Sequence, residues 1–214
     1  MTASHRAAWL GGLRLVPLPA VATATTGGAI VVLGASGPPD RLRSWVVMTG
    51  LVLAAIVALA VDDPTESLAA SAPIGRRVRW TIRAVATTTA AAAGLAWVIG
   101  VAVVSDGSSS ATMVFSTMEL DTLFLQFGTY VLVALAVAGH SVRRWGPGTG
   151  LRSAAPALVL VHLGVELIGG SWARLLPGAD PGTARWWASL LVLAAAVYLL
   201  VSTDPTRHLS VVRR

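Results

Sequence analysis

Apolar residues fill six long segments of the chain, and stretches rich in polar residues, glycine or proline separate them. A helix needs about 20 residues to cross the hydrocarbon core of a bilayer, and each segment is long enough, or nearly so. We therefore predict an all-α membrane protein. Its six transmembrane helices are expected near Leu18–Ser36, Ser44–Val61, Arg83–Val104, Thr122–Gly139, Ala154–Gly169 and Trp186–Val201.

The segments outside the six spans have distinct patterns. Residues 1–17 place Trp9, Leu10 and Leu13 among arginines, which favours an amphipathic helix in the membrane interface. An extension of the first span is the alternative. The six-span domain then covers residues 18–203, with a loop at 62–82, another at 170–185 and a tail at 204–214.

Composition and charge support a membrane protein with a defined orientation. The chain of 214 residues is 55% hydrophobic and 12% charged, with a mean hydropathy of +0.71, whereas soluble domains have about a quarter of their residues charged. All 16 basic residues are arginine, and most fall in the N-terminal segment, the loops after the second and fourth spans, and the tail. Arginine gathers on the cytosolic side, so we predict both termini inside a multi-pass protein of the inner (plasma) membrane. The net charge of +6 indicates this orientation and no nucleic-acid partner.

The sequence carries no motif for catalysis. A phosphate-binding loop of the Walker type ends in lysine and serine or threonine, and this chain has no lysine. It has no cysteine, so it contains neither disulfides nor thiolate ligands, and its four histidines are scattered. We predict that the chain is not an enzyme and holds no metal or cofactor of its own.

Ionisable and amide side chains inside the predicted spans form one candidate site. His162 and Glu166 lie four residues apart, hence on one face of the fifth span, and Gln126 lies within the fourth. Ionisable residues at such depth are costly and indicate function by default. We predict that these three line a substrate path. A purely structural pair, or a fifth span that ends early and leaves Glu166 near the outer interface, are the alternatives.

The loop at 62–82 has the pattern of a short surface helix. Asp63 is a suitable N-cap, Pro64 fits the first helical position, and Glu66 completes a capping box. Pro73 and Gly75 end the helix before a run of arginines. A capped helix on the cytosolic face is suited to docking a partner.

The stretch D-D-P-T-E-S-L-A-A-S-A-P-I-G-R-R-V-R resembles the D-D-P…L…S-x-P…R-R loop of small actinobacterial permeases of the ABC-2 (type V) exporters. The six-span plan with an interfacial entry helix is similar to that family as well. The resemblance implies that Asp63–Ser71 is a coupling helix docking into a cytosolic ATPase subunit, which holds the ATP and Mg. It also implies a dimer of this chain with itself or with a related permease. The implied docking residues are Asp62, Asp63, Pro64, Glu66, Leu68, Arg76 and Arg77.

We therefore expect the permease subunit of an ATP-driven exporter, embedded in the lipid bilayer. A non-transporting anchor or accessory subunit of a larger membrane complex is one alternative. A proton-coupled secondary transporter using His162 and Glu166 is the other.

Overall fold

A computed structural model describes residues 17–34, 39–62, 76–105, 117–172 and 184–202, and within these ranges the regular structure is helical. The helices are α2 (Leu18–Gly34), α3 (Pro39–Val57), the 3-10 turn η1 (Ala58–Ala60), α4 (Arg76–Ser105), α6 (Thr117–Trp145), α7 (Gly150–Trp172) and α8 (Ala184–Ser202). The prediction of an all-α fold is confirmed for the described residues, and each predicted span overlaps one α-helix.

Three helices extend beyond the predicted spans. α4 begins at Arg76, inside the segment predicted as the loop 62–82. Arginine is a good helix former, so the helix continues past the apolar segment on its polar side. Similarly, α7 reaches Trp172 and α8 begins at Ala184, both inside the segment predicted as the loop 170–185. The interfacial helix, the coupling helix at 63–71 and the tail at 204–214 lie outside the described residues, apart from Pro17.

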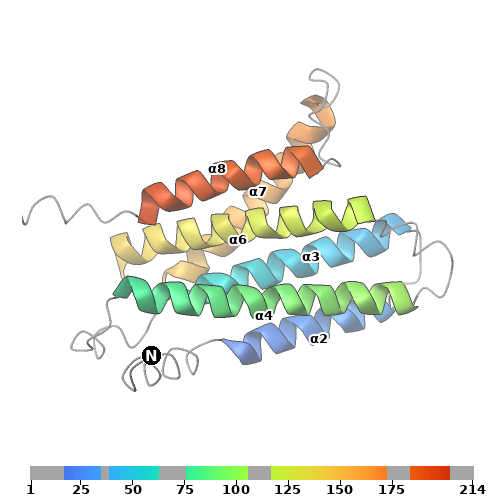
Figure 1. Ribbon diagram of the computed structural model, residues 1–214, viewed down its shortest axis with the longest axis horizontal. Helices are drawn as coiled ribbons and strands as arrows, with labels where there is room; N and C mark the ends of the chain where they lie inside the picture. The colour runs from blue at the N-terminus through green and yellow to red at the C-terminus, as the bar shows by residue number, and fades with distance from the viewer. Residues whose placement is uncertain (1–16, 35–38, 63–75, 106–116, 173–183, 203–214) are drawn as a thin grey trace, which may run out of the picture.

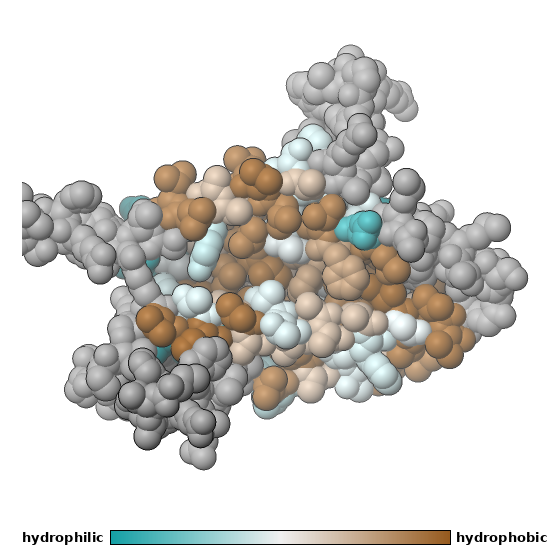
Figure 2. Space-filling view, viewed as in Figure 1, coloured by the Kyte–Doolittle hydropathy of each residue, from teal (hydrophilic) through white to brown (hydrophobic). Residues whose placement is uncertain are grey.

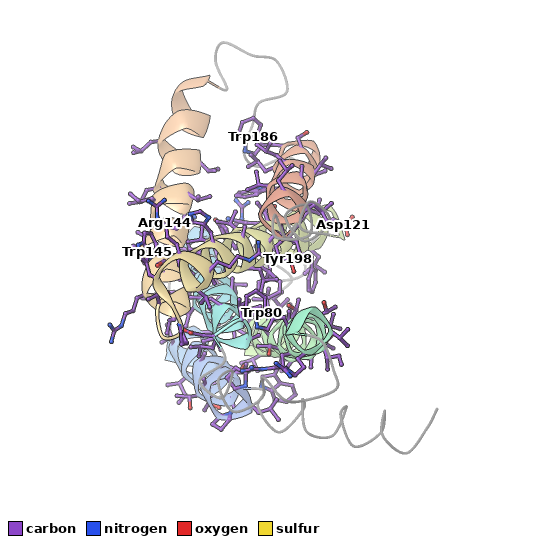
Figure 3. All side chains as sticks on the ribbon, turned by 90° about the vertical axis from the view of Figure 1, so that its left-hand side faces the viewer. Trp80, Asp121, Arg144, Trp145, Trp186 and Tyr198 are labelled. Atoms are coloured by element: carbon purple, nitrogen blue, oxygen red, sulfur yellow. The ribbon has the colours of Figure 1, made fainter. Side chains whose placement is uncertain are left out.

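Successive helices run in alternating directions, so that connected ends gather at the two ends of one bundle (Figure 1). One end holds the start of α4, the end of α6 and the start of α7. We call it the basic end, after its residues Arg79, Arg143, Arg144 and Arg152. The C-terminal end of α7 stands apart from the other helices at the opposite end (Figures 1 and 3).

Three of the described helices are long and apolar enough to cross a membrane, over Leu42–Ala60, Val78–Val104 and Leu120–Trp145. Large apolar side chains are also exposed, among them Trp97, Val192 and Leu200. Hydrophobic residues cover much of the visible face of the bundle (Figure 2). A soluble protein rarely leaves extended apolar patches in water. These features indicate a membrane protein, and the remaining helices, Leu18–Gly34, Gly150–Val165 and Trp186–Leu200, are shorter apolar segments.

Helix α6 is the centre of the bundle. It packs against α8, α7 and α3, while α2 packs on the far side against α4 and α3. Among the three long helices its side chains are accordingly the most buried, since 67% of its apolar 18-residue stretch lies inside the protein. Gln126, Thr129 and Tyr130, in the middle of α6, are therefore held in the interior, which positions the site described below.

Glycines bring α2 close to both of its neighbours. A Cβ built on Gly28 would lie 2.5 Å from Thr49 Cγ2 on α3, and one on Gly94 of α4 would overlap the Thr25 hydroxyl of α2. Small residues at such crossings allow helix backbones to approach, as expected in membranes. Gly28 and Thr25 of α2 thus lie at close crossings with α3 and α4.

Candidate functional site

A buried chain of three polar side chains connects α6 to α7. Gln126 Nε2 donates a hydrogen bond to Tyr130 Oη over 2.8 Å, and the same hydroxyl lies 2.7 Å from His162 Nδ1. Gln126 and Tyr130 are four residues apart, so one helix face presents both. His162 approaches from α7, and all three side chains are buried.

Gln126 Nε2 can only donate, so the Tyr130 oxygen accepts its hydrogen bond. The direction of the hydrogen bond between the Tyr130 hydroxyl and His162 Nδ1 follows the imidazole tautomer: the hydroxyl donates when Nδ1 carries no hydrogen, and Nδ1 donates when it does. With either tautomer, the two hydrogen bonds connect α6 to α7 in a low-dielectric interior, where a hydrogen bond is electrostatically stronger than in water.

On the side of α8, an aromatic contact covers the Tyr130 ring. The Trp187 ring meets Tyr130 edge to face, with centroids 5.7 Å apart, and only 2% of Trp187 and 1% of Tyr130 are exposed. The Thr129 hydroxyl donates to the Leu125 carbonyl at 2.9 Å and lies 3.5 Å from the Trp187 carbonyl. Three helices thus hold the phenol of Tyr130 in one position.

A small cavity lies beside the hydrogen-bonded side chains of Gln126 and Tyr130, between α3, α4 and α6. Its lining is almost entirely apolar, and Gln126 and Tyr130 form one wall of it; the other lining residues are Val46, Val47, Gly50, Leu95, Leu123 and Phe127. Its size is about that needed by a single water molecule. In this conformation the site is a packed junction.

The structure joins two of the three predicted path residues. Gln126 and His162 meet through Tyr130, whereas Glu166 lies one turn beyond His162 on α7, and its side chain is outside the described part of the structure. Tyr130 itself was missed from the sequence. The spacing of four between Gln126 and Tyr130 was the available signal, but tyrosines at helix positions are common and this one pointed to no chemistry by itself.

Asp62 forms a second polar connection, at the basic end. Its Oδ1 accepts a short hydrogen bond from the Gly148 amide, and its Oδ2 accepts one of 3.2 Å from the Gly150 amide. Gly150 is the first residue of α7, where backbone amides lack helical partners. A carboxylate at this position satisfies them and complements the helix dipole. Asp62 therefore caps α7 from a distant part of the chain.

The turn that Asp62 binds depends on glycine. Gly146 and Gly148 have φ of +90° and +88°, a region that other residues rarely adopt. The Thr149 hydroxyl donates to the Gly146 carbonyl at 2.7 Å, and the Ser153 hydroxyl donates to the Thr149 carbonyl at 2.9 Å. The turn thus has a definite shape that directs its amides at Asp62.

The other predicted docking residues divide into two groups. Arg76 and Arg77 form the first turn of α4, with side chains outside the described residues, and the segment containing Asp63, Pro64, Glu66 and Leu68 lies outside them as well. Asp62 is thus the one predicted docking residue whose contacts the structure describes, and it binds within the chain.

Comparison with known proteins found no match to a protein-family model, to a curated protein or to a solved structure. Among the described residues, no group of three or more histidine, aspartate or glutamate side chains is arranged to hold a metal ion.

Proposed function

We propose that the chain is the transmembrane permease subunit of an ATP-driven exporter of the ABC-2 class. It would act as a multi-pass inner-membrane protein, in a dimer with an identical or related chain, and separate cytosolic ATPase subunits would supply the energy. The basic end would face the cytosol, in keeping with the cytosolic preference of arginine.

The observation that carries the proposal is the position of Asp62. This residue directly precedes the candidate coupling helix, Asp63–Ser71, and its carboxylate is bonded to the first turn of α7. Displacement of the coupling helix would therefore move the end of α7 with it. Farther along, α7 is bonded to α6 through His162 and Tyr130. A displacement of the coupling helix at the cytosolic face would thus be transmitted to α7 through Asp62, and from α7 to α6 through the His162–Tyr130 hydrogen bond.

The first experiment is purification of the tagged chain in mild detergent, with mass spectrometry of the proteins that accompany it. We expect a stoichiometric ATPase carrying Walker motifs. Asp63→Ala and Leu68→Pro should release that ATPase or uncouple its hydrolysis, while Asp121→Ala at the opposite end should not. A well-folded Leu68→Pro complex with normal substrate-stimulated ATPase activity would contradict the coupling role, and recovery without any ATPase would favour an accessory subunit.

The buried Gln126–Tyr130–His162 chain favours a second candidate, a proton-coupled secondary transporter. The Tyr130 hydroxyl and the His162 imidazole can exchange a proton across their hydrogen bond between α6 and α7, and intramembrane histidine is frequent in proton relays. Transport by purified chain in proteoliposomes would then follow a pH gradient without nucleotide, and His162→Leu would abolish it. Transport that requires ATP and the partner ATPase would instead support the exporter.

A further inference from the structure

The C-terminal end of α6 carries exposed cationic and aromatic side chains outside both polar connections described above. Trp145 is 62% exposed. The Arg144 guanidinium lies over its ring, 5.7 Å from the centroid, and the His140 ring meets it edge to face at 6.4 Å. Arg144 and Trp145 lie together at the margin of the basic end (Figure 3).

A second helix adds cationic charge at the same end. Arg152 lies in the first turn of α7 and is exposed, as are Arg143 and Arg144. Together with Trp145 these three arginines form what we call the interfacial patch. Among the described residues of this end Asp62 carries the one carboxylate, and its oxygens accept hydrogen bonds from backbone amides. The described residues of this end therefore carry more arginine than carboxylate.

The depth of the patch matches a lipid headgroup. The apolar part of α6, Leu120–Trp145, has 26 residues. At 1.5 Å per residue this is about 39 Å, whereas the hydrocarbon core of a bilayer is about 30 Å thick. When α6 crosses a bilayer, its last turn lies at the level of the headgroups, where tryptophan and arginine are both favoured.

Helix α7 continues the patch into a surface suited to an acyl chain. Val159 and Leu163 follow Arg152 at intervals of seven and four residues, which places all three on one face of the helix. Val159 is 51% exposed and Leu163 49% exposed. An arginine above an exposed apolar stripe fits a molecule with an anionic head and an apolar tail.

We propose that the interfacial patch binds the phosphate headgroup of an anionic phospholipid, with its acyl chain along Val159 and Leu163 of α7. Arginine pairs with phosphate through two parallel hydrogen bonds, and the Trp145 ring lies at the boundary between head and tail. An acidic protein surface is the alternative occupant. The lipid is favoured because Arg152 of the patch lies on the same face of α7 as the exposed Val159 and Leu163.

The test is native mass spectrometry of the full chain in neutral detergent, titrated with phosphatidylglycerol or phosphatidylcholine. Each exposed arginine near an anionic lipid is expected to strengthen binding about five-fold. Arg144→Gln with Arg152→Gln should therefore weaken phosphatidylglycerol binding roughly 25-fold and leave phosphatidylcholine binding unchanged. Arg43→Gln removes a charge at the opposite end and serves as the matched control.

Several outcomes would overturn the proposal. One is a phosphatidylglycerol affinity that is unchanged in the double variant. Another is a loss of phosphatidylglycerol affinity in Arg43→Gln that equals the loss in the double variant. Competition by free glycerol phosphate at similar concentrations would show a site for soluble phosphate. Loss of a co-purifying protein from the double variant, with lipid affinity intact, would show that the patch binds a protein instead.

Discussion

Tyr130 is the central member of the buried chain, and Tyr130→Phe removes its hydroxyl while keeping the ring against Trp187. The change leaves Gln126 Nε2 and His162 Nδ1 without the partner that each has at 2.8 Å and 2.7 Å. A buried polar group that loses its partner costs about 1–3 kcal/mol in proteins generally. Hydrogen bonds between membrane helices average about 0.6 kcal/mol and reach about 1.7. With two bonds lost, we expect the free energy of unfolding to fall by about 1–3 kcal/mol.

The assay is unfolding of the purified chain by dodecyl sulfate in mixed micelles, followed by far-ultraviolet circular dichroism. The control is Tyr198→Phe, which makes the same chemical change at the second of the chain's two tyrosines, half-buried on α8. A cycle that combines Tyr130→Phe with His162→Leu isolates the bond between α6 and α7, and should give a coupling of about 1 kcal/mol. Equal stability of the Tyr130→Phe and Tyr198→Phe variants, or a coupling near zero, would refute the assignment of this chain as a connection between helices.

Two further predictions use the same unfolding assay. Asp62→Ala removes the acceptor for two amides at the start of α7 and should cost about 1–2 kcal/mol, as loss of a helix cap does. Asp121→Ala, an exposed carboxylate at the opposite end, should change stability by less than about 0.5 kcal/mol, and an equal effect of the two would argue against the cap. Gly94→Ala places a methyl group on the Thr25 hydroxyl and should cost about 1–3 kcal/mol. Gly100→Ala on the same helix has nothing within 4 Å of its new Cβ and should be neutral or slightly stabilising, so a destabilising Gly100→Ala would weaken the packing argument.

The helices themselves could be predicted from the sequence because a helix satisfies its backbone hydrogen bonds locally, and an apolar run is enough to indicate one in a membrane. Their ends were harder to predict. α4 begins at Arg76 and α6 runs on to Trp145, in both cases through arginines that hydropathy assigns to a loop. Helix formation depends on backbone propensity as well as on polarity, so the polar ends stay helical beyond the apolar core.

Polar residues within spans identified part of the candidate site. Gln126 and His162 are polar residues inside predicted membrane spans, where such residues are unusual, and this was the reason to predict them as site residues. Their connection through Tyr130 depends on how far α6 and α7 are rotated about their axes, since a turn of one residue would move the phenol by about 100°. That rotation is set by the packing of Trp187 and the other core side chains around α6.

The sequence by itself thus determined an all-helical membrane protein and the approximate position of each helix. It also marked two groups of polar residues as candidate sites: those of the loop at 62–82, and Gln126, His162 and Glu166 inside the predicted spans. Only the tertiary structure decided that Asp62 bonds to Gly148 and Gly150, 86 and 88 positions away, rather than to its own loop. The physical reason is one of range. Helix formation is decided by neighbouring residues, whereas a side-chain partner across the bundle exists only once the direction, rotation and depth of two helices have been set together.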